Sequence, residues 1–237
     1  MNYIKIITLF LFFIWFFFIF ETKIKEEKTI KLVYIKQEKI DEKKDLFDFK
    51  SDSWITKYIS PNISFKKLDY IPKDLVLIKW DYIIDSKWNQ KLRFEAAENL
   101  KSLSKDFFKN FQTKIKIISA YRSYNYQVWI KSWWCSDLFC AKAWYSEHQS
   151  WLAFDMFETS NQKNFLSNKN YKLYFDWMME NAPKYWFTNS YQKWKEIDWY
   201  EIEPWHFRYV WIKLAKILQE DKLTFSEFYN NLKTNEE

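Results

Sequence analysis

Apolar residues fill the N-terminal segment of the chain almost without interruption. Fifteen nearly all-hydrophobic residues, Ile6 to Phe20, follow Lys5. As a helix this run spans about 22 Å, which is short of the roughly 30 Å hydrocarbon core of a bilayer. It ends at Glu21 without the small residues of a signal-peptide cleavage site. We therefore favour an uncleaved membrane anchor over a cleaved signal segment for residues 1–20, and expect the rest of the chain to be exported.

The pattern changes twice beyond this apolar run. Residues 21–60 are rich in lysine and glutamate and show little apolar periodicity, so we expect them to form a charged tether. From Pro61 onward, apolar residues recur at the spacings of helices and strands. The folded domain is predicted to span residues 61–237 and to end in one or two helices.

Helical and strand-like spacings mix within this domain without a regular rhythm. Strict alternation predicts strands at 114–119, 151–157 and near 205–210. Spacings of three and four residues predict helices at 91–111, at 124–132 and at about 170–182. A repeating strand–helix–strand order is missing from the sequence, so the pattern predicts an α+β fold rather than α/β.

The distribution of charge adds little to the predicted fold and function. The formal net charge is +6, and lysines and acids are interspersed along the whole chain. Such a distribution is typical of a solvated surface and gives no footprint for nucleic acid. We expect a monomer that does not bind nucleic acid.

The absence of glycine is the most unusual feature of the composition. Average usage of about 7% predicts roughly 17 glycines in a chain of this length, whereas the sequence has none and has 15 tryptophans. Turns and helix ends need residues that tolerate positive φ, which is costly with a β-carbon. We hypothesise that most of these tryptophans are glycine in the living protein, because UGA codons are read there as glycine. The alternative is an aromatic-rich protein that truly lacks glycine.

The positions of several tryptophans favour this exchange. Trp186 follows a helix-like run and precedes Phe187, where a helix-terminating glycine is common. Trp88 occupies a turn between two periodic segments. Trp133 and Trp134 lie together in a loop that contains serine and cysteine.

The two cysteines, Cys135 and Cys140, are five residues apart in this loop. In an exported protein a local disulfide is the favoured interpretation, and two reduced thiols are the alternative. The sequence does not predict a structural zinc knuckle, because the chain has no second cysteine pair to complete four ligands.

The only two histidines of the chain each have acidic residues nearby. Asp155 comes seven residues after His148 on an otherwise apolar strand, and His206 comes three residues after Glu203. Two imidazoles and one carboxylate leave a fourth position for water, which is typical of catalytic zinc. Glu203 is the candidate base for that water, and Pro204 places it in a turn rather than a regular helix. Each histidine alone is more often a structural residue than a ligand, and non-haem iron uses the same ligand types.

Three segments together resemble the VanY-type D-alanyl-D-alanine carboxypeptidases, which are zinc peptidases of the LAS type that trim peptidoglycan stem peptides. SEHQSWLAFD (146–155) is similar to their motif S-x-H-x-x-G-x-A-x-D, and EPWHFRYV (203–210) resembles their second motif. AYRSYNYQ (120–127) is similar to their substrate-binding segment. The similarity extends from about Pro61 to Gln219, and order and spacing agree in all three segments.

The resemblance implies a role for each matching residue. His148, Asp155 and His206 match the zinc ligands, and Glu203 matches the catalytic base. Three further residues match substrate-binding positions: Arg122, which would hold a carbonyl oxygen or carboxylate of the substrate, Gln127 and Ser146. A surface salt bridge is the alternative for Arg122.

The absence of glycine is the main departure from the family pattern. The family has glycine where this chain has Trp151, and tends to have it at Trp144 and Trp211. Trp205 matches a true tryptophan, and we expect the same of Trp177. A bulky indole at 151 would displace His148 or block the cleft.

The leading functional hypothesis is therefore a membrane-anchored, extracytoplasmic zinc carboxypeptidase that removes the terminal D-alanine from stem peptides. Related enzymes cleave an L-lysyl–D-alanine bond of the tetrapeptide, and this L,D-activity stays open. A third possibility is a non-catalytic cell-wall-binding protein, in which exposed indoles would stack on sugars.

Overall fold

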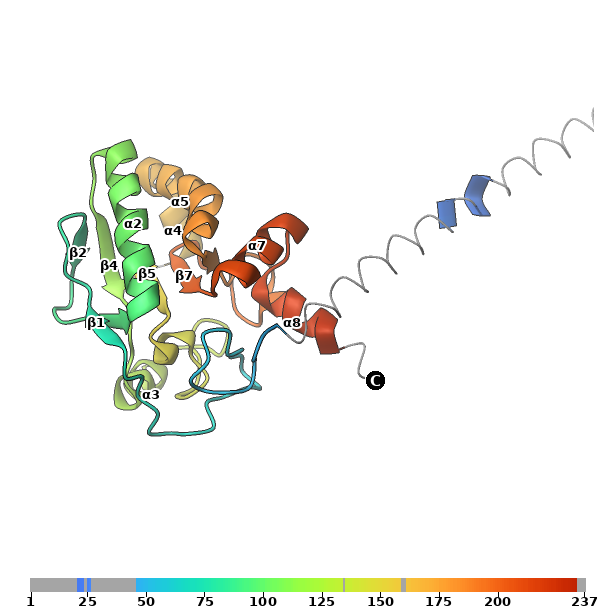
Figure 1. Cartoon of the computed structure of the whole chain (residues 1–237), viewed down its shortest axis with the longest axis horizontal. Coiled ribbons are helices and arrows are strands. Elements are labelled where there is room, and N and C mark those ends of the chain that lie inside the picture. Colours follow the sequence, from blue (N-terminus) through green and yellow to red (C-terminus); the bar gives the residue numbers. More distant parts are fainter. Residues whose placement is uncertain (1–20, 24, 27–45, 134, 159–160, 234–237) are drawn as a thin grey trace, which may run out of the picture. The chain divides into compact units, whose positions relative to one another are not determined.

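The computed structural model describes residues 21–23, 25–26, 46–133, 135–158 and 161–233 (Figure 1). The predicted membrane anchor, residues 1–20, lies outside the described residues, as does most of the predicted tether. Among the residues that the structure describes, no helix combines the length and hydropathy that a membrane span requires.

The chain divides into two units, residues 1–47 and 48–237. The second unit therefore begins at Asp48, earlier than the predicted boundary at residue 61. Tyr58 and Ile59 are buried, and the Tyr58 ring stacks on Tyr229 with ring centroids 3.9 Å apart. The last part of the predicted tether thus belongs to the folded domain, because its few apolar residues pack against the C-terminal helix.

A five-stranded mixed sheet forms the centre of the second unit. Its strands lie in the order β2-β4-β5-β7-β6, where β2 pairs with β4 in parallel and all other neighbours are antiparallel. The bounds are Ile83–Asp85 (β2), Ile115–Ser119 (β4), Ala153–Met156 (β5), Phe187–Asn189 (β6) and His206–Tyr209 (β7). A separate antiparallel pair joins β1 (Leu75–Leu77) and β3 (Lys91–Arg93). The predicted strands at 114–119, 151–157 and 205–210 are confirmed as β4, β5 and β7.

Helices surround this sheet and occupy much of the remaining chain. The α-helices are α2 (Phe94–Phe111), α3 (Tyr124–Ser132), α4 (Gln162–Ser167), α5 (Lys169–Asn181), α6 (Lys195–Asp198), α7 (Ile212–Asp221) and α8 (Phe225–Lys233). Two short 3-10 helices are η1 (Glu147–Ser150) and η2 (Ala182–Tyr185). The predicted helices at 91–111, 124–132 and 170–182 correspond to α2, α3 and α5, with the first one beginning after β3. The α+β prediction is confirmed.

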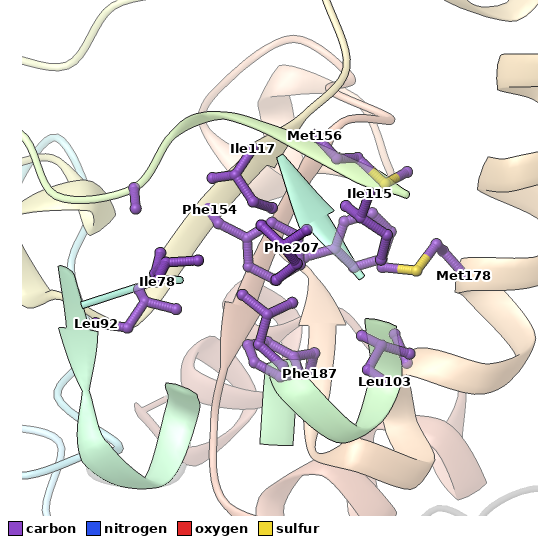
Figure 2. Close-up of a cluster of buried hydrophobic side chains, with 14 of the residues drawn as sticks. Ile78, Leu92, Leu103, Ile115, Ile117, Phe154, Met156, Met178, Phe187 and Phe207 are labelled. Atoms are coloured by element: carbon purple, nitrogen blue, oxygen red, sulfur yellow. The ribbon is translucent and has the colours of Figure 1, made fainter. Parts of the chain in front are cut away.

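The core lies between the sheet and the amphipathic helices α2 and α5 (Figures 1 and 2). Phe154 of β5 and Phe207 of β7 are buried beside Ile117, Phe187 and Leu103. The predicted alternation along β5 is confirmed, since Leu152, Phe154 and Met156 all belong to this core. Their strand neighbour Asp155 is buried on the other face of the sheet, which is where the candidate site forms.

The predicted disulfide between Cys135 and Cys140 is present, with the two Cα atoms 5.7 Å apart. It closes the loop between α3 and η1. This pairing is consistent with an oxidising compartment.

Phe107 tests the contribution of the core to stability. Its side chain is fully buried in α2, and its ring contacts Phe111, Tyr174 and Trp177. Phe107→Ala should lower the free energy of unfolding by about 3–5 kcal/mol, because a cavity replaces the ring. Leu173→Ala on the exposed side of α5 should change it by less than about 0.5 kcal/mol. Equal effects in denaturant titrations would contradict this assignment of the core.

Candidate active site

The register of three neighbouring strands brings the first site residues together. Asp155 of β5 lies directly opposite His206 of β7 in the antiparallel pair. On its other side, Asp155 pairs with Ser119 at the end of β4. Residues that face each other across an antiparallel pair have β-carbons about 5 Å apart. The side chains of Asp155 and His206 therefore meet on one face of the sheet although 51 residues separate them.

His148 reaches the same place from η1, the short helix before β5. Ser146 caps this helix by accepting a hydrogen bond from the backbone N–H of His148 at 3.4 Å. Two contacts join η1 to the loop after β4: His148 Nδ1 lies 2.6 Å from the carbonyl oxygen of Ala120, and the N–H of Arg122 donates to the carbonyl of His148 at 3.2 Å. The first contact orients the imidazole, and the second joins the backbone of η1 to that of the loop after β4.

His148, Asp155 and His206 form a group with the geometry of a metal site. All three are buried, and their ligand atoms lie within 4.8 Å of one another. His148 Nε2 lies 3.1 Å from Asp155 Oδ2, and His206 Nδ1 lies 2.9 Å from Asp155 Oδ1. These are the nitrogens that face the shared carboxylate, so His148 Nε2 and His206 Nδ1 are the atoms that could hold a metal ion.

The outward nitrogen of each imidazole has a partner of its own. The carbonyl oxygen of Ala120 lies 2.6 Å from His148 Nδ1, and a carboxylate oxygen of Glu147 lies 2.9 Å from His206 Nε2. Ligating histidines usually carry such a partner, which fixes the tautomer and leaves the other nitrogen's lone pair for the metal.

Glu147 was not found by the sequence analysis. Its carboxylate is buried and receives hydrogen bonds from Ser190 Oγ at 2.7 Å and Arg208 Nη1 at 2.7 Å, in addition to His206. Burial opposes ionisation, but Arg208 and His206 lower the pKa of Glu147 to about 2. Arg208 lies two residues after His206 and so projects from the same face of β7. This two-residue spacing was the only signal in the sequence for Arg208 at the site, and it did not identify Glu147 as the partner of Arg208.

The electrostatics of the group favour the metal-binding protonation states of His148 and Asp155, but favour a protonated His206. Burial, with Arg122 adding to it, lowers the pKa of His148 to about 4, so its imidazole is neutral. Burial acts to raise the pKa of Asp155, yet interactions with His148 and Arg122 hold it well below the usual range. Burial also acts to lower the pKa of His206, but hydrogen bonds to Asp155 and Glu147 raise it to about 9. The carboxylates of Asp155 and Glu147 would stabilise either a proton on His206 or a metal ion, so proton binding and metal binding compete at this residue.

Glu203 is held beside this group by a turn. Its N–H donates to the carbonyl of Tyr191 at 3.0 Å, and its own carbonyl accepts from the N–H of His206 at 3.1 Å and from Asn189 Nδ2 at 2.8 Å. Burial raises the pKa of Glu203 to about 7, partly offset by His206 and reinforced by Asp155. A carboxylate with a pKa near neutrality is suited to accept and release a proton.

Arg122 also reaches the site, through contacts that its predicted role did not include. Its Nη2 donates to Asp155 Oδ2 at 2.6 Å, and its Nε donates to Ser119 Oγ at 2.9 Å. A guanidinium has five N–H donors, so these two bonds leave donors for a further anionic group. Its side chain is 19% exposed, so solvent reaches part of the guanidinium-bearing chain.

The two remaining predicted substrate residues are placed differently. Ser146 caps η1, as described above, and its side chain is buried. Gln127 in α3 is fully buried, and its amide donates to the carbonyl of Ala141 at 2.8 Å. Both residues therefore have a supporting role within the fold, and their contact with substrate stays a prediction. A single-residue match to a motif cannot distinguish these two roles.

An α+β domain with a buried His–Asp–His group, a carboxylate of raised pKa and a partly exposed arginine has the elements of a metallohydrolase. Comparison with known proteins agrees with this class. A model of the VanY family, D-alanyl-D-alanine carboxypeptidase, matches residues 89–212. The chain belongs to this family.

Two curated relatives are carboxypeptidases by name. "Putative carboxypeptidase YodJ" of Bacillus subtilis (strain 168) is 36% identical over 176 residues, which are 70% of this chain and 63% of the relative. D-alanyl-D-alanine carboxypeptidase of Enterococcus faecium is 28% identical over 140 residues, which are 59% of this chain and 44% of the relative. The chain thus spans less than two thirds of the length of either relative.

Solved structures share the fold. The LdcB LD-carboxypeptidase superposes with a TM-score of 0.64 at 30% identity, covering 76% of this chain and 88% of that one. VanYB in complex with D-alanine-D-alanine gives a TM-score of 0.54 at 22% identity, covering 73% and 95%. The predicted LAS-type peptidase fold is confirmed.

Glu147 offers a test of how His206 is held. Glu147→Gln should weaken the binding of a divalent metal roughly 10- to 100-fold, because the hydrogen bond that fixes His206 becomes weaker. A competition titration with a chromophoric chelator measures this affinity, and circular dichroism reports the fold. Glu98→Gln on the exposed face of α2 is the matched control. Unchanged metal affinity in a folded Glu147→Gln protein would show that Glu147 does not position His206.

Proposed function

We propose that the chain is a zinc-dependent carboxypeptidase that removes the terminal D-alanine from peptidoglycan stem peptides. The observation that carries the proposal is the buried group of His148, Asp155 and His206, with His148 Nε2 and His206 Nδ1 both facing the Asp155 carboxylate. Two imidazoles and one carboxylate suit zinc and leave a fourth position open, as catalytic zinc sites do. Membership of the VanY family supports the same reaction class.

The ion, when bound, would supply a water of lowered pKa and polarise the scissile carbonyl. Glu203 would accept the proton of that water and return it to the amine of the departing D-alanine. Its pKa of about 7 suits both steps, because a group that titrates near the working pH exchanges protons in either direction. Pro204 and the backbone hydrogen bonds of the 203–206 turn keep the backbone of Glu203 next to His206.

Arg122 would bind the anionic part of the substrate. Its remaining N–H donors can hold either the terminal carboxylate or the carbonyl oxygen, which becomes negative as the bond breaks. The contacts with Asp155 and Ser119 fix the guanidinium plane and so set the direction of those donors.

Two peptide bonds of the stem peptide are candidates for cleavage. D,D-activity on pentapeptides is supported by the VanY family model and by the relative from Enterococcus faecium. L,D-activity on tetrapeptides is the alternative, and the similarity to the LdcB LD-carboxypeptidase favours it.

We further propose an extracytoplasmic location, with residues 1–20 as a single-pass anchor and a monomeric catalytic domain. The apolar run from Ile6 to Phe20 supports the anchor, and the Cys135–Cys140 disulfide supports an oxidising compartment. A non-catalytic cell-wall-binding role draws its support from exposed indoles such as Trp54, Trp129 and Trp194.

Defined peptides test the reaction. The protein should release D-alanine from a stem pentapeptide or tetrapeptide, and a zinc chelator should abolish the release until zinc is restored. Chromatography of the products shows which peptide is cut and therefore decides between D,D- and L,D-activity. Binding to wall fragments without chelator-sensitive release from either peptide would overturn the enzymatic proposal.

Glu203 tests the proton transfer. Glu203→Gln should lower kcat by roughly 10²- to 10⁴-fold, because the amide cannot accept the proton. Zinc affinity should change little, since Glu203 is not among the three proposed ligands. Glu201→Gln, two residues before Glu203 and outside the 203–206 turn, is the matched control and should keep full activity. A Glu203→Gln protein with near-normal kcat would refute the assigned role.

A further inference from the structure

Tryptophan dominates the left-handed backbone positions of this protein. Ten described residues have positive φ, and six of them are tryptophans: Trp88, Trp144, Trp151, Trp186, Trp199 and Trp211. In this region a β-carbon crowds the neighbouring carbonyl oxygen, whereas glycine adopts it without penalty. Asparagine tolerates it better than most residues, but an indole brings no compensating backbone contact. The residue type that this backbone favours is absent from the sequence.

Four of these positions have a local role that calls for glycine. Trp151, Trp186 and Trp199 end the short helices η1, η2 and α6 with φ values of 57°, 65° and 72°, and glycine is the usual residue at such ends. Trp211 precedes α7 with φ 72° and ψ 154°. That combination lies close to a region that is essentially restricted to glycine.

Other described tryptophans are outside the positive-φ set, and some of them have side chains that pack against the core. Trp177 lies within α5, and its ring packs edge-on against Phe107 at 5.5 Å. Trp205 packs against the core near Phe165. Trp194 has φ −72°, and so does not need glycine. Trp133 ends α3 with φ −81°, so the glycine expected there gains no support, and Trp134 lies outside the described residues.

We propose that the functional protein carries glycine at positions 88, 144, 151, 186, 199 and 211, and tryptophan at 177 and 205. The printed sequence then represents a reading of UGA codons as tryptophan in a gene whose host reads them as glycine. Backbone conformation separates the two groups of tryptophans. The complete lack of glycine supports the same exchange independently.

The exchange at 151 changes the wall of a cavity next to the proposed active site. The indole of Trp151 stacks on the ring of Tyr121, with centroids 4.0 Å apart and planes inclined by 5°. Trp88 and Trp151 both line a cavity of about 540 Å³ that also contacts Ser119, the partner of Arg122. Glycine at 88 and 151 enlarges this cavity and uncovers the face of Tyr121. Position 151 therefore sets the size of a cavity that reaches Ser119, the hydrogen-bond partner of Arg122.

Peptide mass spectrometry of the protein from cells that carry the gene tests the assignment directly. Cleavage after Lys195 and Arg208 yields one peptide that contains both position 199 and position 205. We expect glycine at 199 and tryptophan at 205 in that single peptide. Tryptophan at both positions would overturn the proposal, and glycine at both would overturn the rule that separates them by conformation. Neither outcome depends on enzymatic activity, so the proposed function is tested separately.

Two exposed tryptophans provide a matched test in the recombinant protein. Trp88 (φ 60°) and Trp194 (φ −72°) are 85% and 69% exposed, so each substitution removes only a minor amount of buried surface. Trp88→Gly should raise the thermal midpoint by roughly 2–4 °C, because the left-handed backbone is relieved. Trp194→Gly should lower it or leave it unchanged, and Trp88→Ala should give no gain because it keeps the β-carbon. Equal gains from Trp88→Gly and Trp194→Gly, or from Trp88→Gly and Trp88→Ala, would overturn the proposal.

Discussion

The pairing of Asp155 with His206 across β5 and β7 is the constraint on which the site depends. In an antiparallel pair a shift of one residue moves every side chain to the opposite face of the sheet. The buried face of β5, with Leu152, Phe154 and Met156 in the core, therefore fixes the register that sends Asp155 toward His206. The hydrophobic core and the candidate site are thus specified by the same strand. His148 then completes the group of three side chains from η1, the short helix that precedes β5.

Charge balance explains how so many ionisable groups can be buried there. Asp155 is paired with Arg122 at 2.6 Å, and Glu147 with Arg208 at 2.7 Å. A buried carboxylate without such a partner is strongly destabilising, whereas a paired and hydrogen-bonded one can be retained. His206 lies between the two carboxylates, with one ring nitrogen toward each. The two pairs orient its ring, and so direct Nδ1 toward His148 and Asp155.

Much of this arrangement was predictable from the sequence because it depends on local patterns. Alternating and helical spacings located β4, β5, β7 and the helices α2, α3 and α5, and the spacing of motifs located the three candidate ligands. Partners that meet only through tertiary structure were not predictable. Glu147 reads as one of many surface acids, and its contacts Ser190 and Arg208 come from segments 43 and 61 residues away. The domain boundary was missed for a similar reason, since Tyr58 gains its packing from Tyr229 near the other end of the chain.

A crystal structure with zinc, located by anomalous scattering, would test the central claim most directly. We predict an ion bound by His148 Nε2, the Asp155 carboxylate and His206 Nδ1, with Glu147 still bonded to His206 Nε2 and Glu203 beside the open fourth position. An ion bound elsewhere on the domain, or bound through His206 Nε2 with Glu147 as a ligand, would contradict the account of the site given above.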